Sequence, residues 1–293
     1  MAVEFQSFST QGICESRRQL HTPSSFARSS LLYVQEVGSL RSIRSHLSQR
    51  SHLDSYLFIL VLSGSGKVSC GGTSYDLKGG DCALIDCRSP YSHQSSEQDP
   101  WELMWVHFNG CTAPAYYGYF TKNVSCPVFH TEDIALFSTP ILQLLETVSH
   151  KDKTAELQCS KLITDILTLC FTVPLKQELA SQTGSLGKLQ SVKEYIDSHY
   201  AEKLSLDELS EQFFLSKFHL SREFKRIYGI TVGSYILTQR ITYAKELLRF
   251  SDKSMEAIAI ACGIMDTSYF NKVFKKSEGV SPSQYRKHWA HRP

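Results

Sequence analysis

The chain has 293 residues, of which 42% are hydrophobic and 20% charged, and its formal net charge is +2. This length suits two domains, and the near-average composition excludes a mainly disordered, collagen-like or coiled-coil chain. No stretch approaches the ~20 apolar residues that cross a bilayer, and the first thirty residues are polar and serine-rich, unlike a secretory signal, so we expect a cytoplasmic protein without a membrane partner.

Cysteine and charge patterns narrow the chemistry further. Nine cysteines are scattered without a C-x-x-C pair, which indicates reduced thiols rather than zinc or redox chemistry, so we expect no metal and no cofactor. Residues 187–293 hold 17 of the 31 basic residues but only 12 of the 29 acidic ones. This local surplus of basic residues is typical of a module that binds phosphate groups, although a solvated basic surface would give the same surplus.

The N-terminal part of the chain predicts a β domain. Residues 1–30 give no clear pattern and are interpreted as an N-terminal arm. Short β-rich runs broken by glycine-rich turns then follow over 31–130, at 31–34, 55–70, 71–77, 81–86 and 101–108. Closely spaced strands of this kind predict a barrel or a sandwich. The run from Tyr56 to Ser65 hardly alternates, as expected for a strand covered on both faces.

Two helices are predicted next, over residues 131–175. Thr139 and Pro140 offer a helix start, and apolar residues follow at helical spacing to Val148. A second apolar stripe runs from Cys159 to Cys170 within 155–171, and we expect Pro174 to end that helix. The two helices pack either on the barrel or on a second subunit as a dimer contact. Residues 176–188 lack apolar periodicity and are interpreted as the linker.

The last hundred residues contain an internal repeat. The segment SLDELS at 205–210 matches SMEAIA at 254–259, an offset of 49. LSREFKRIYGITVGSY at 220–235 then matches FNKVFKKSEGVSPSQY at 270–285, an offset of 50. Repeated units of this kind are one supersecondary element used twice.

Each copy has the pattern of two short helices joined by a tight turn. In the first copy a capping box at Ser205 and a second cap at Ser216 open the two helices. Leu206, Leu209 and Phe213, then Leu220, Phe224 and Ile227, are predicted to face inward. The side chains left facing outward on the second helix of this copy are Lys217, Phe218, Ser221, Arg222 and Lys225.

The second copy repeats the arrangement. Phe270, Val273 and Phe274 face inward, and the predicted outward set is Thr267, Ser268, Tyr269, Asn271 and Lys272. Between the copies a helix over 232–249 carries one apolar stripe and forms a stiff spacer. Recognition helices fit the major groove, and successive grooves on one DNA face are ~34 Å apart, so two such units suit duplex DNA. The alternative is an ordinary helical domain whose outward basic residues serve solubility.

These motifs, together with QRITYAKELL, resemble the DNA-binding domain of the AraC/XylS family of regulators over residues 189–287. The resemblance implies a DNA-binding domain over 189–290, in which Phe218, Ser221 and Arg222 read base edges in the first unit. It implies the same role for Ser268, Tyr269 and Lys272 in the second. Phe214 stands where glycine is common, and Ile264 where phenylalanine is; both are expected to affect packing more than DNA contact. Lys272 replaces a frequent arginine, which predicts a less rigid contact.

The strand region resembles the cupin-type effector domain that accompanies such DNA-binding domains. The resemblance rests on Gly79-Gly80-Asp81, Pro90, His93 and PWELMWVHF at 100–108. In a regular strand Trp101, Leu103, Trp105 and His107 share one face, and an indole offers a platform for the C–H face of a sugar. The candidate effector-binding residues are Trp105, His93, Leu103, Ser63, Trp101 and His107. Positions matching Ser63 and Leu103 are usually more polar in sugar-responsive members, which argues against a simple sugar, and both tryptophans also fit a plain core.

The resulting prediction is an α+β protein of two domains: a β-barrel with two following helices, and an all-α domain of two helix-turn-helix units joined by a long helix. Its expected function is a transcription factor regulated by a small-molecule effector such as a carbohydrate. The expected partners are promoter DNA, RNA polymerase and a second copy of the chain. The alternatives are a metal-dependent cupin enzyme with a DNA-binding module, against which the lack of an H-x-H cluster counts, and an unregulated DNA-architectural protein.

Overall fold

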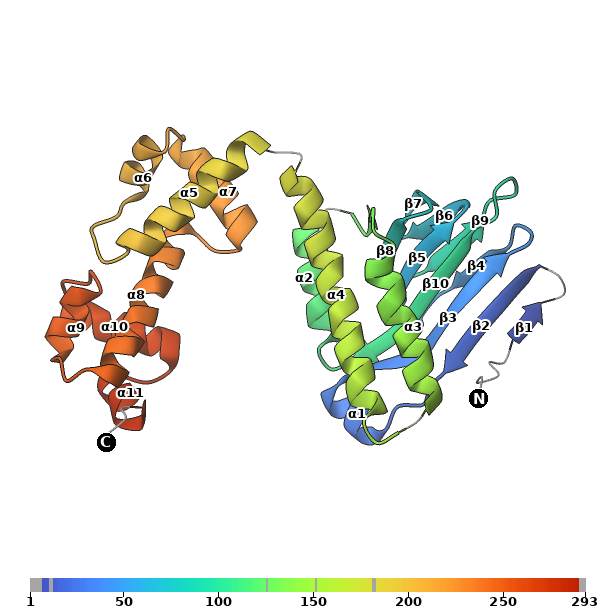
Figure 1. The fold of residues 1–293 in the computed structure, drawn as a ribbon, viewed down its shortest axis with the longest axis horizontal. Coiled ribbons are helices and arrows are strands. Elements are labelled where there is room, and N and C mark those ends of the chain that lie inside the picture. The colour runs from blue at the N-terminus through green and yellow to red at the C-terminus, as the bar shows by residue number, and fades with distance from the viewer. Residues whose placement is uncertain (1–6, 11–12, 125, 151, 181–182, 290–293) are drawn as a thin grey trace. The chain divides into compact units, whose positions relative to one another are not determined.

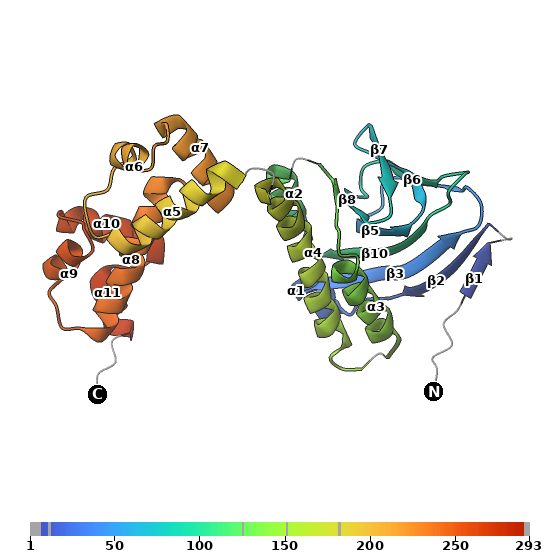
Figure 2. The ribbon, with the colours of Figure 1, turned by 45° about the horizontal axis from the view of Figure 1, so that its top comes forward.

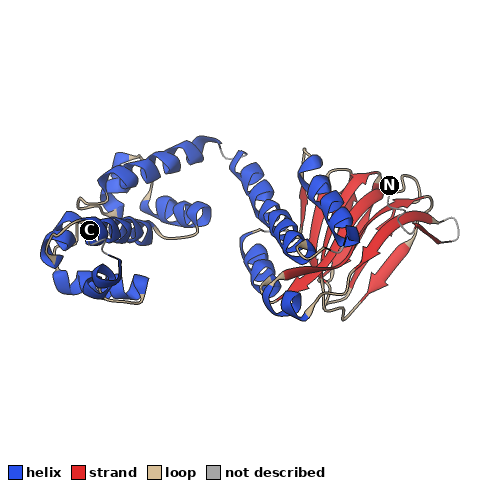
Figure 3. Cartoon of the chain, turned by 60° about the horizontal axis from the view of Figure 1, so that its bottom comes forward, coloured by secondary structure: helices blue, strands red, loops and turns tan. Residues whose placement is uncertain are grey.

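The computed structural model describes residues 7–10, 13–124, 126–150, 152–180 and 183–289. The chain divides into two compact units, an N-terminal unit (Met1–Ala180) and a C-terminal unit (Ser181–Pro293). The described strands all lie in the N-terminal unit, whereas the described elements of the C-terminal unit are helices joined by turns and loops (Figure 3). The α+β fold class and the two-domain organisation predicted from the sequence are therefore confirmed.

A seven-stranded antiparallel sheet forms the centre of the N-terminal unit. Its strand order is β1-β2-β3-β10-β5-β8-β11. The strands are β1 (Ser7–Thr10), β2 (Cys14–Leu20), β3 (Leu32–Ser42), β5 (Tyr56–Ser63), β8 (Asp81–Asp86), β10 (Glu102–Gly110) and β11 (Val128–His130).

A smaller antiparallel sheet covers one face of this sheet. Its order is β4-β9-β6-β7, and its strands are β4 (Leu47–Arg50), β6 (Ser65–Cys70), β7 (Thr73–Lys78) and β9 (Tyr91–Ser95). Side chains of both sheets, including Val68, Leu77 and Leu103, meet in one core between them.

Helices cover the opposite face of the large sheet (Figure 2). They are α1 (Ser25–Ser30), α2 (Ala113–Asn123), α3 (Ala135–His150) and α4 (Ala155–Ala180). The sheet separates two cores, because successive side chains of a strand point to opposite faces. In β10, Met104 and Val106 join the core under the helices, whereas Leu103 and Trp105 join the core between the sheets. Strand β5 is buried on both faces, as its lack of alternation predicts.

The structure corrects three expectations about the N-terminal unit. Residues 14–20, assigned to an arm, form β2, which pairs with β3 from Cys14↔Ser42 to Leu20↔Glu36; residues 1–6 and 11–12 lie outside the described part. Helix α3 begins at Ala135, so Pro140 lies inside it rather than at its start. The apolar stripes of α3 and α4 pack on the chain's own sheet, which is one of the two placements expected for them.

The third correction concerns the end of α4. Pro174 lies inside this helix, which continues to Ala180. The ring removes one helical hydrogen bond, but the turns around it pack on the core through Phe171 and Val173. The Gln177 amide also donates to the His130 carbonyl at 2.9 Å. The expected linker at 176–188 consequently holds the end of α4 and the start of α5 (Thr183–His199).

In the C-terminal unit, α8 runs from one helix pair to the other (Figure 1). Its first turns, with Val232 and Ile236, belong to a core with α6 and α7. Its later turns, with Ile241 and Leu248, belong to a second core with α9, α10 and α11. The helices are α6 (Leu206–Gln212), α7 (Lys217–Tyr228), α8 (Val232–Phe250), α9 (Met255–Ala261), α10 (Thr267–Glu278) and α11 (Pro282–Trp289).

The repeat is confirmed down to individual hydrogen bonds. Ser205 caps α6 with a complete capping box, and Ser254 caps α9. The turns close alike, with Leu215 N–H donating to Ser210 and Ile264 N–H donating to Ala259, each at 2.9 Å. Both α7 and α10 end at a glycine in the left-handed region, where a Cβ would be strained. The pattern of two helices and a tight turn therefore follows from local sequence.

Candidate DNA-reading surface and effector cavity

Helix α7 presents the outward set predicted for the first unit. Leu220 and Phe224 are fully buried, which fixes the rotation of the helix. The opposite side consequently faces solvent, where Lys217, Phe218, Arg222 and Lys225 are exposed and Ser221 is half-buried. Phe218 is 74% exposed, so most of this large apolar ring is open to solvent.

Arg222 is held in place on this surface. Its guanidinium lies over the Phe218 ring, 5.6 Å from the centroid, and its Nε donates to Glu223 Oε1 at 2.9 Å. Burial opposes ionisation of Glu223, but hydrogen bonds from Arg226 and Arg222 outweigh it and lower the pKa of that carboxyl. A guanidinium has five N–H donors, so Arg222 keeps donors for a base edge while its stem is oriented.

Lys217 has a different environment from the other predicted contacts. Its ammonium forms an ion pair with Asp207, in the first turn of α6. Both side chains are more than half exposed, so the pair is weak and a phosphate can replace the carboxylate.

Helix α10 presents the corresponding set in the second unit. Phe270 and Phe274 are fully buried, and Ser268, Tyr269, Asn271 and Lys272 are exposed, with Thr267 half-buried. The Asp266 carboxylate caps the helix by accepting from the Ser268 and Tyr269 amides at 2.7 and 3.0 Å. Met265, just before this cap, is 79% exposed; the sequence reasoning did not select it.

The two turns differ at one equivalent position. Phe214 in the first unit has φ +52° and Gly263 in the second has φ +73°. The Phe214 side chain is 87% exposed, so the expectation that it perturbs packing is wrong: the turn carries it into solvent at a strained backbone position. Ile264 is buried in the second core, as its expected packing role requires.

A cavity of about 250 Å³ lies between the two sheets of the N-terminal unit. Strands of the large sheet contribute Arg18, Glu36, Leu40, Leu57, Ile59, Leu103 and Trp105, and the smaller sheet and its entry contribute His46, Leu47, Ser48, Arg50 and His93. A concave site with mixed apolar and convergent polar side chains is the usual form of a small-molecule site.

Three of the six predicted effector-binding residues line this cavity: His93, Leu103 and Trp105. The other three lie elsewhere. Trp101 is fully buried beside Gly66, where a Cβ would lie 2.3 Å from the indole. His107 is buried and its Nδ1 lies 3.0 Å from Ser55 Oγ. Ser63 is exposed at the end of β5.

Sequence reasoning missed the charged residues of the cavity, Arg18, Glu36 and Arg50, and the neighbouring His46. Arg18 lies 3.4 Å from Glu36 and 5.5 Å from the centroid of the Trp105 ring. Burial, with His46 and Arg50 nearby, lowers the pKa of His93 to about 4, and burial lowers that of His46. Arg18 was missed because β2 was assigned to an arm, and no local motif marks His46 or Arg50.

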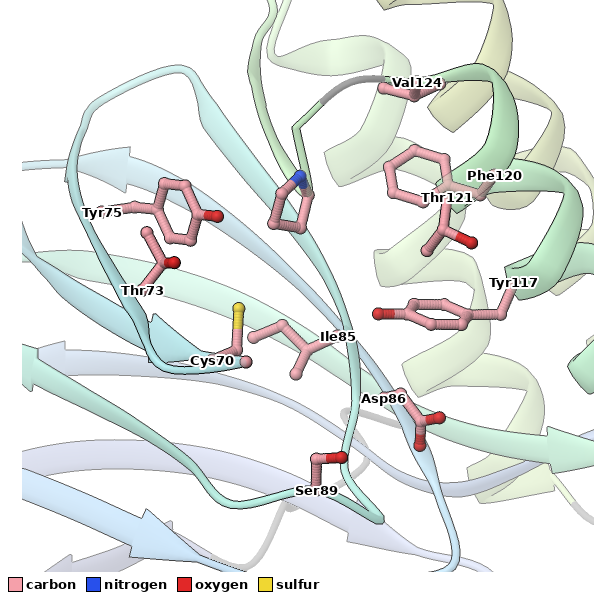
Figure 4. Close-up of a pocket in the computed structure, with 12 residues that line it drawn as sticks. Cys70, Thr73, Tyr75, Ile85, Asp86, Ser89, Tyr117, Phe120, Thr121 and Val124 are labelled. Carbon is pink, nitrogen blue, oxygen red and sulfur yellow. The ribbon is translucent and has the colours of Figure 1, made fainter.

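A second cavity, of about 310 Å³, lies between the β6–β7 hairpin and α2 (Figure 4). Tyr75, Cys70 and Tyr117 face its interior. Asp86 also lines it, but this carboxylate is paired with Arg88 at 2.8 Å. None of the predicted effector-binding residues lines this second cavity.

The described residues contain no cluster of three or more histidine, cysteine or acidic side chains that could hold a metal ion. His46 and His93 share the first cavity, whereas His107 bonds to Ser55 instead. Among the helices that the structure describes, none is both long and apolar enough to cross a membrane.

Comparison with known proteins gives matches in both units. The model of the AraC-like ligand binding domain matches residues 33–167, and that of a helix-turn-helix domain matches 209–288. The chain is 29% identical to the MmsAB operon regulatory protein of Pseudomonas aeruginosa, over 87% of this chain and 82% of that protein. It is 25% identical to the Msm operon regulatory protein of Streptococcus mutans, over 87% and 92%. A solved structure, the C-terminal domain of the response regulator AraT from Geobacillus stearothermophilus, is 31% identical over 36% of this chain and 88% of that one, with a TM-score of 0.35.

Proposed function

Because this chain belongs to the AraC family of transcriptional regulators and carries its ligand-binding and DNA-binding domains in that order, we propose that α7 and α10 are its two base-reading helices. The observation that carries this proposal is the repeat itself. Helices α7 and α10 present equivalent polar faces. Each helix packs in its own core against a different part of one continuous helix, α8. Such a pair matches two successive major grooves.

In this proposal the outward residues of the two helices divide into two roles. Phe218, Ser221 and Arg222 contact base edges in one groove, and Ser268, Tyr269 and Lys272 do so in the other. The remaining contacts, from Lys217, Lys225, Thr267 and Asn271, go to the phosphate backbone. Base contacts give sequence preference, whereas phosphate contacts fix position and affinity.

The cavity between the sheets is the proposed effector site. Trp105 offers an aromatic face to the ligand, and His93 and Leu103 lie beside it; a carbohydrate derivative is one class that such a face accepts. The effector regulates the protein by binding one conformational state better than another, since only differential affinity shifts an equilibrium.

The protein acts as a homodimer through the outer faces of α3 and α4. Leu142 and Leu157 are each 51% exposed on these helices, on sides that their own core does not use. Its partners are promoter DNA in the cytoplasm and RNA polymerase, and it has no enzymatic activity of its own.

Genomic DNA recovered by the purified full chain and then sequenced tests this function. We expect a two-part motif whose half-sites lie about one helical turn apart. Recovery of DNA without any motif, in the presence or absence of sugars and sugar acids, would support the DNA-architectural alternative instead.

A further inference from the structure

We propose that the effector is a small organic monoanion, a carboxylate that also has an apolar or C–H face, bound in the cavity between the sheets. This inference rests on the proposed effector site and adds the chemical class of its ligand. It comes from the charges and the unpartnered donors of the cavity lining, rather than from the aromatic face alone.

The charge of the lining does not balance. Arg18 and Arg50 each bring one positive charge, whereas Glu36 brings the one carboxylate of the lining. Glu36 is already engaged by Arg18 at 3.4 Å. Within the described residues Arg50 has no ion-pair partner, so one positive charge remains at the cavity. A monoanion neutralises it, whereas a phosphate ester, with a charge of about −1.5 to −2, leaves a negative surplus.

The lining also contains a buried polar atom that lacks a partner. His93 Nδ1 is inaccessible to solvent and, in the part of the chain that the structure describes, has no hydrogen-bond partner. A buried polar group without a partner costs free energy, and because His93 lines the cavity, a rotation of its ring would bring this atom to a ligand oxygen. His46 and Arg50 line the same cavity, so two imidazoles and one guanidinium border the space where a carboxylate would lie.

The other side of the cavity is apolar. Leu57, Ile59, Leu103 and Trp105 line it, and the Arg18 guanidinium lies over the Trp105 ring, 5.5 Å from its centroid. The volume of about 250 Å³ lies just below the range of roughly 300–1,000 Å³ for drug-sized ligands. The site consequently suits a single small ring or a short branched acid, with its hydrocarbon face on Trp105 and its carboxylate toward Arg50.

Matched ligand pairs test the proposal on the full chain. Three pairs vary the carboxylate while keeping the ring: galacturonate and galactose, glucuronate and glucose, and benzoate and benzamide. Binding is followed by calorimetry and by the NMR signals of the His93 ring and the Trp105 indole. We expect at least one carboxylate to bind ~10-fold more tightly than its neutral partner, and Arg50→Gln to remove that preference. Lys67→Gln, which neutralises an exposed cation outside the cavity, should leave it intact.

Acetate and inorganic phosphate complete the panel as minimal anions. Acetate should shift the His93 signals at concentrations up to about 100 mM, since a ligand of this size binds weakly. The proposal is overturned if acetate leaves the His93 signals unchanged or if neutral ligands bind as tightly as their carboxylate partners. It is also overturned if phosphate binds more tightly than every carboxylate, or if Arg50→Gln keeps the preference for a carboxylate over its neutral partner. Recovery of a DNA motif alongside any of those results would leave the regulator function standing and remove only the ligand class.

Discussion

Arg222 is oriented by two neighbours on its own helix, and its proposed base contact can be tested separately from the proposed phosphate contact of Lys225. Phe218 lies under its guanidinium and Glu223 accepts from its Nε, whereas Lys225 is exposed on the same helix. Arg222→Ala should cost about 1–3 kcal/mol on a specific duplex and little on a random one. Lys225→Ala should weaken binding to all sequences by a similar factor.

Fluorescence anisotropy with labelled specific and random duplexes, at one fixed salt concentration, distinguishes the two variants. Equal losses from Arg222→Ala and Lys225→Ala on both duplexes would contradict the division of roles. Phe218→Ala is informative alongside them, because the ring both supports Arg222 and can contact a thymine methyl group.

Phe214 and Gly263 form a natural matched pair of backbone positions. Phe214→Gly should raise the stability of the C-terminal unit by about 1 kcal/mol, because it relieves a left-handed conformation that a side chain disfavours and removes an exposed ring. Gly263→Ala should lower stability by more than about 1 kcal/mol, since the new Cβ would lie 2.3 Å from the Ala201 carbonyl oxygen. Urea unfolding of each variant measures both effects; a loss of stability from Phe214→Gly would show that the ring packs in solution.

Histidine burial gives the N-terminal unit a defined pH dependence. Burial, with smaller effects of Arg50 and His93, lowers the pKa of His107 to about 3, and that of His93 is lowered to about 4. Both values lie below the usual 6.5, so the unfolded state takes up protons first as the pH falls. Stability is therefore complete above about pH 6.5 and declines below it, at up to ~1.4 kcal/mol per pH unit for each histidine.

Urea unfolding between pH 7.5 and pH 5 measures this decline. His107→Gln keeps a hydrogen-bonding group near Ser55 and should flatten the slope by the contribution of one histidine. His150→Gln, at an exposed position at the end of α3, should leave the slope unchanged. A slope that His107→Gln does not alter would mean that this imidazole is not the group being protonated.

At the scale of elements, α3 and α4 use two sides of each helix differently. Their inner apolar stripes are buried in the core against the large sheet, whereas the exposed side chains of Leu142 and Leu157 lie outside that core. Leu142→Lys should therefore dissociate the proposed dimer without unfolding the monomer. Light scattering after size exclusion gives the mass, and Leu136→Lys, also at an exposed position of α3, tests whether any exposed leucine has the same effect.

Secondary-structure elements that follow from local patterns were predicted well. The capping box at Ser205, the paired caps and the repeat specify α6 to α10 within short windows. The elements that were missed depend on distant partners. Strand β2 has no strong pattern of its own and exists because β3 pairs along it; the end of α4 persists past Pro174 because Phe171 and Val173 pack on a remote core.

At the scale of the whole molecule, the effector and DNA sites of one regulator must be thermodynamically linked. An effector that changes DNA affinity by a given factor changes its own affinity by the same factor when DNA is bound. We expect Trp105→Ala to abolish the effector's influence on DNA binding while leaving DNA affinity without effector unchanged. Titrating DNA at several effector concentrations checks both; an unchanged effector response in Trp105→Ala would move the effector site elsewhere, with the cavity beside α2 as the next candidate.

The sequence by itself determined the two-domain order, the paired helix-turn-helix units and the outward residues of α7 and α10, because helix rotation follows from a 3.6-residue apolar period. It also predicted that Trp105 and Leu103 share a face, because strand side chains alternate. Only the tertiary structure decided that Trp101 belongs to the core, and that Arg18, His46 and Arg50 meet His93 at one cavity. Arg18 comes from β2, His46 and Arg50 from β4 and the residue before it, and His93 from β9. Their meeting depends on the pairing and packing of two sheets, which no local spacing encodes.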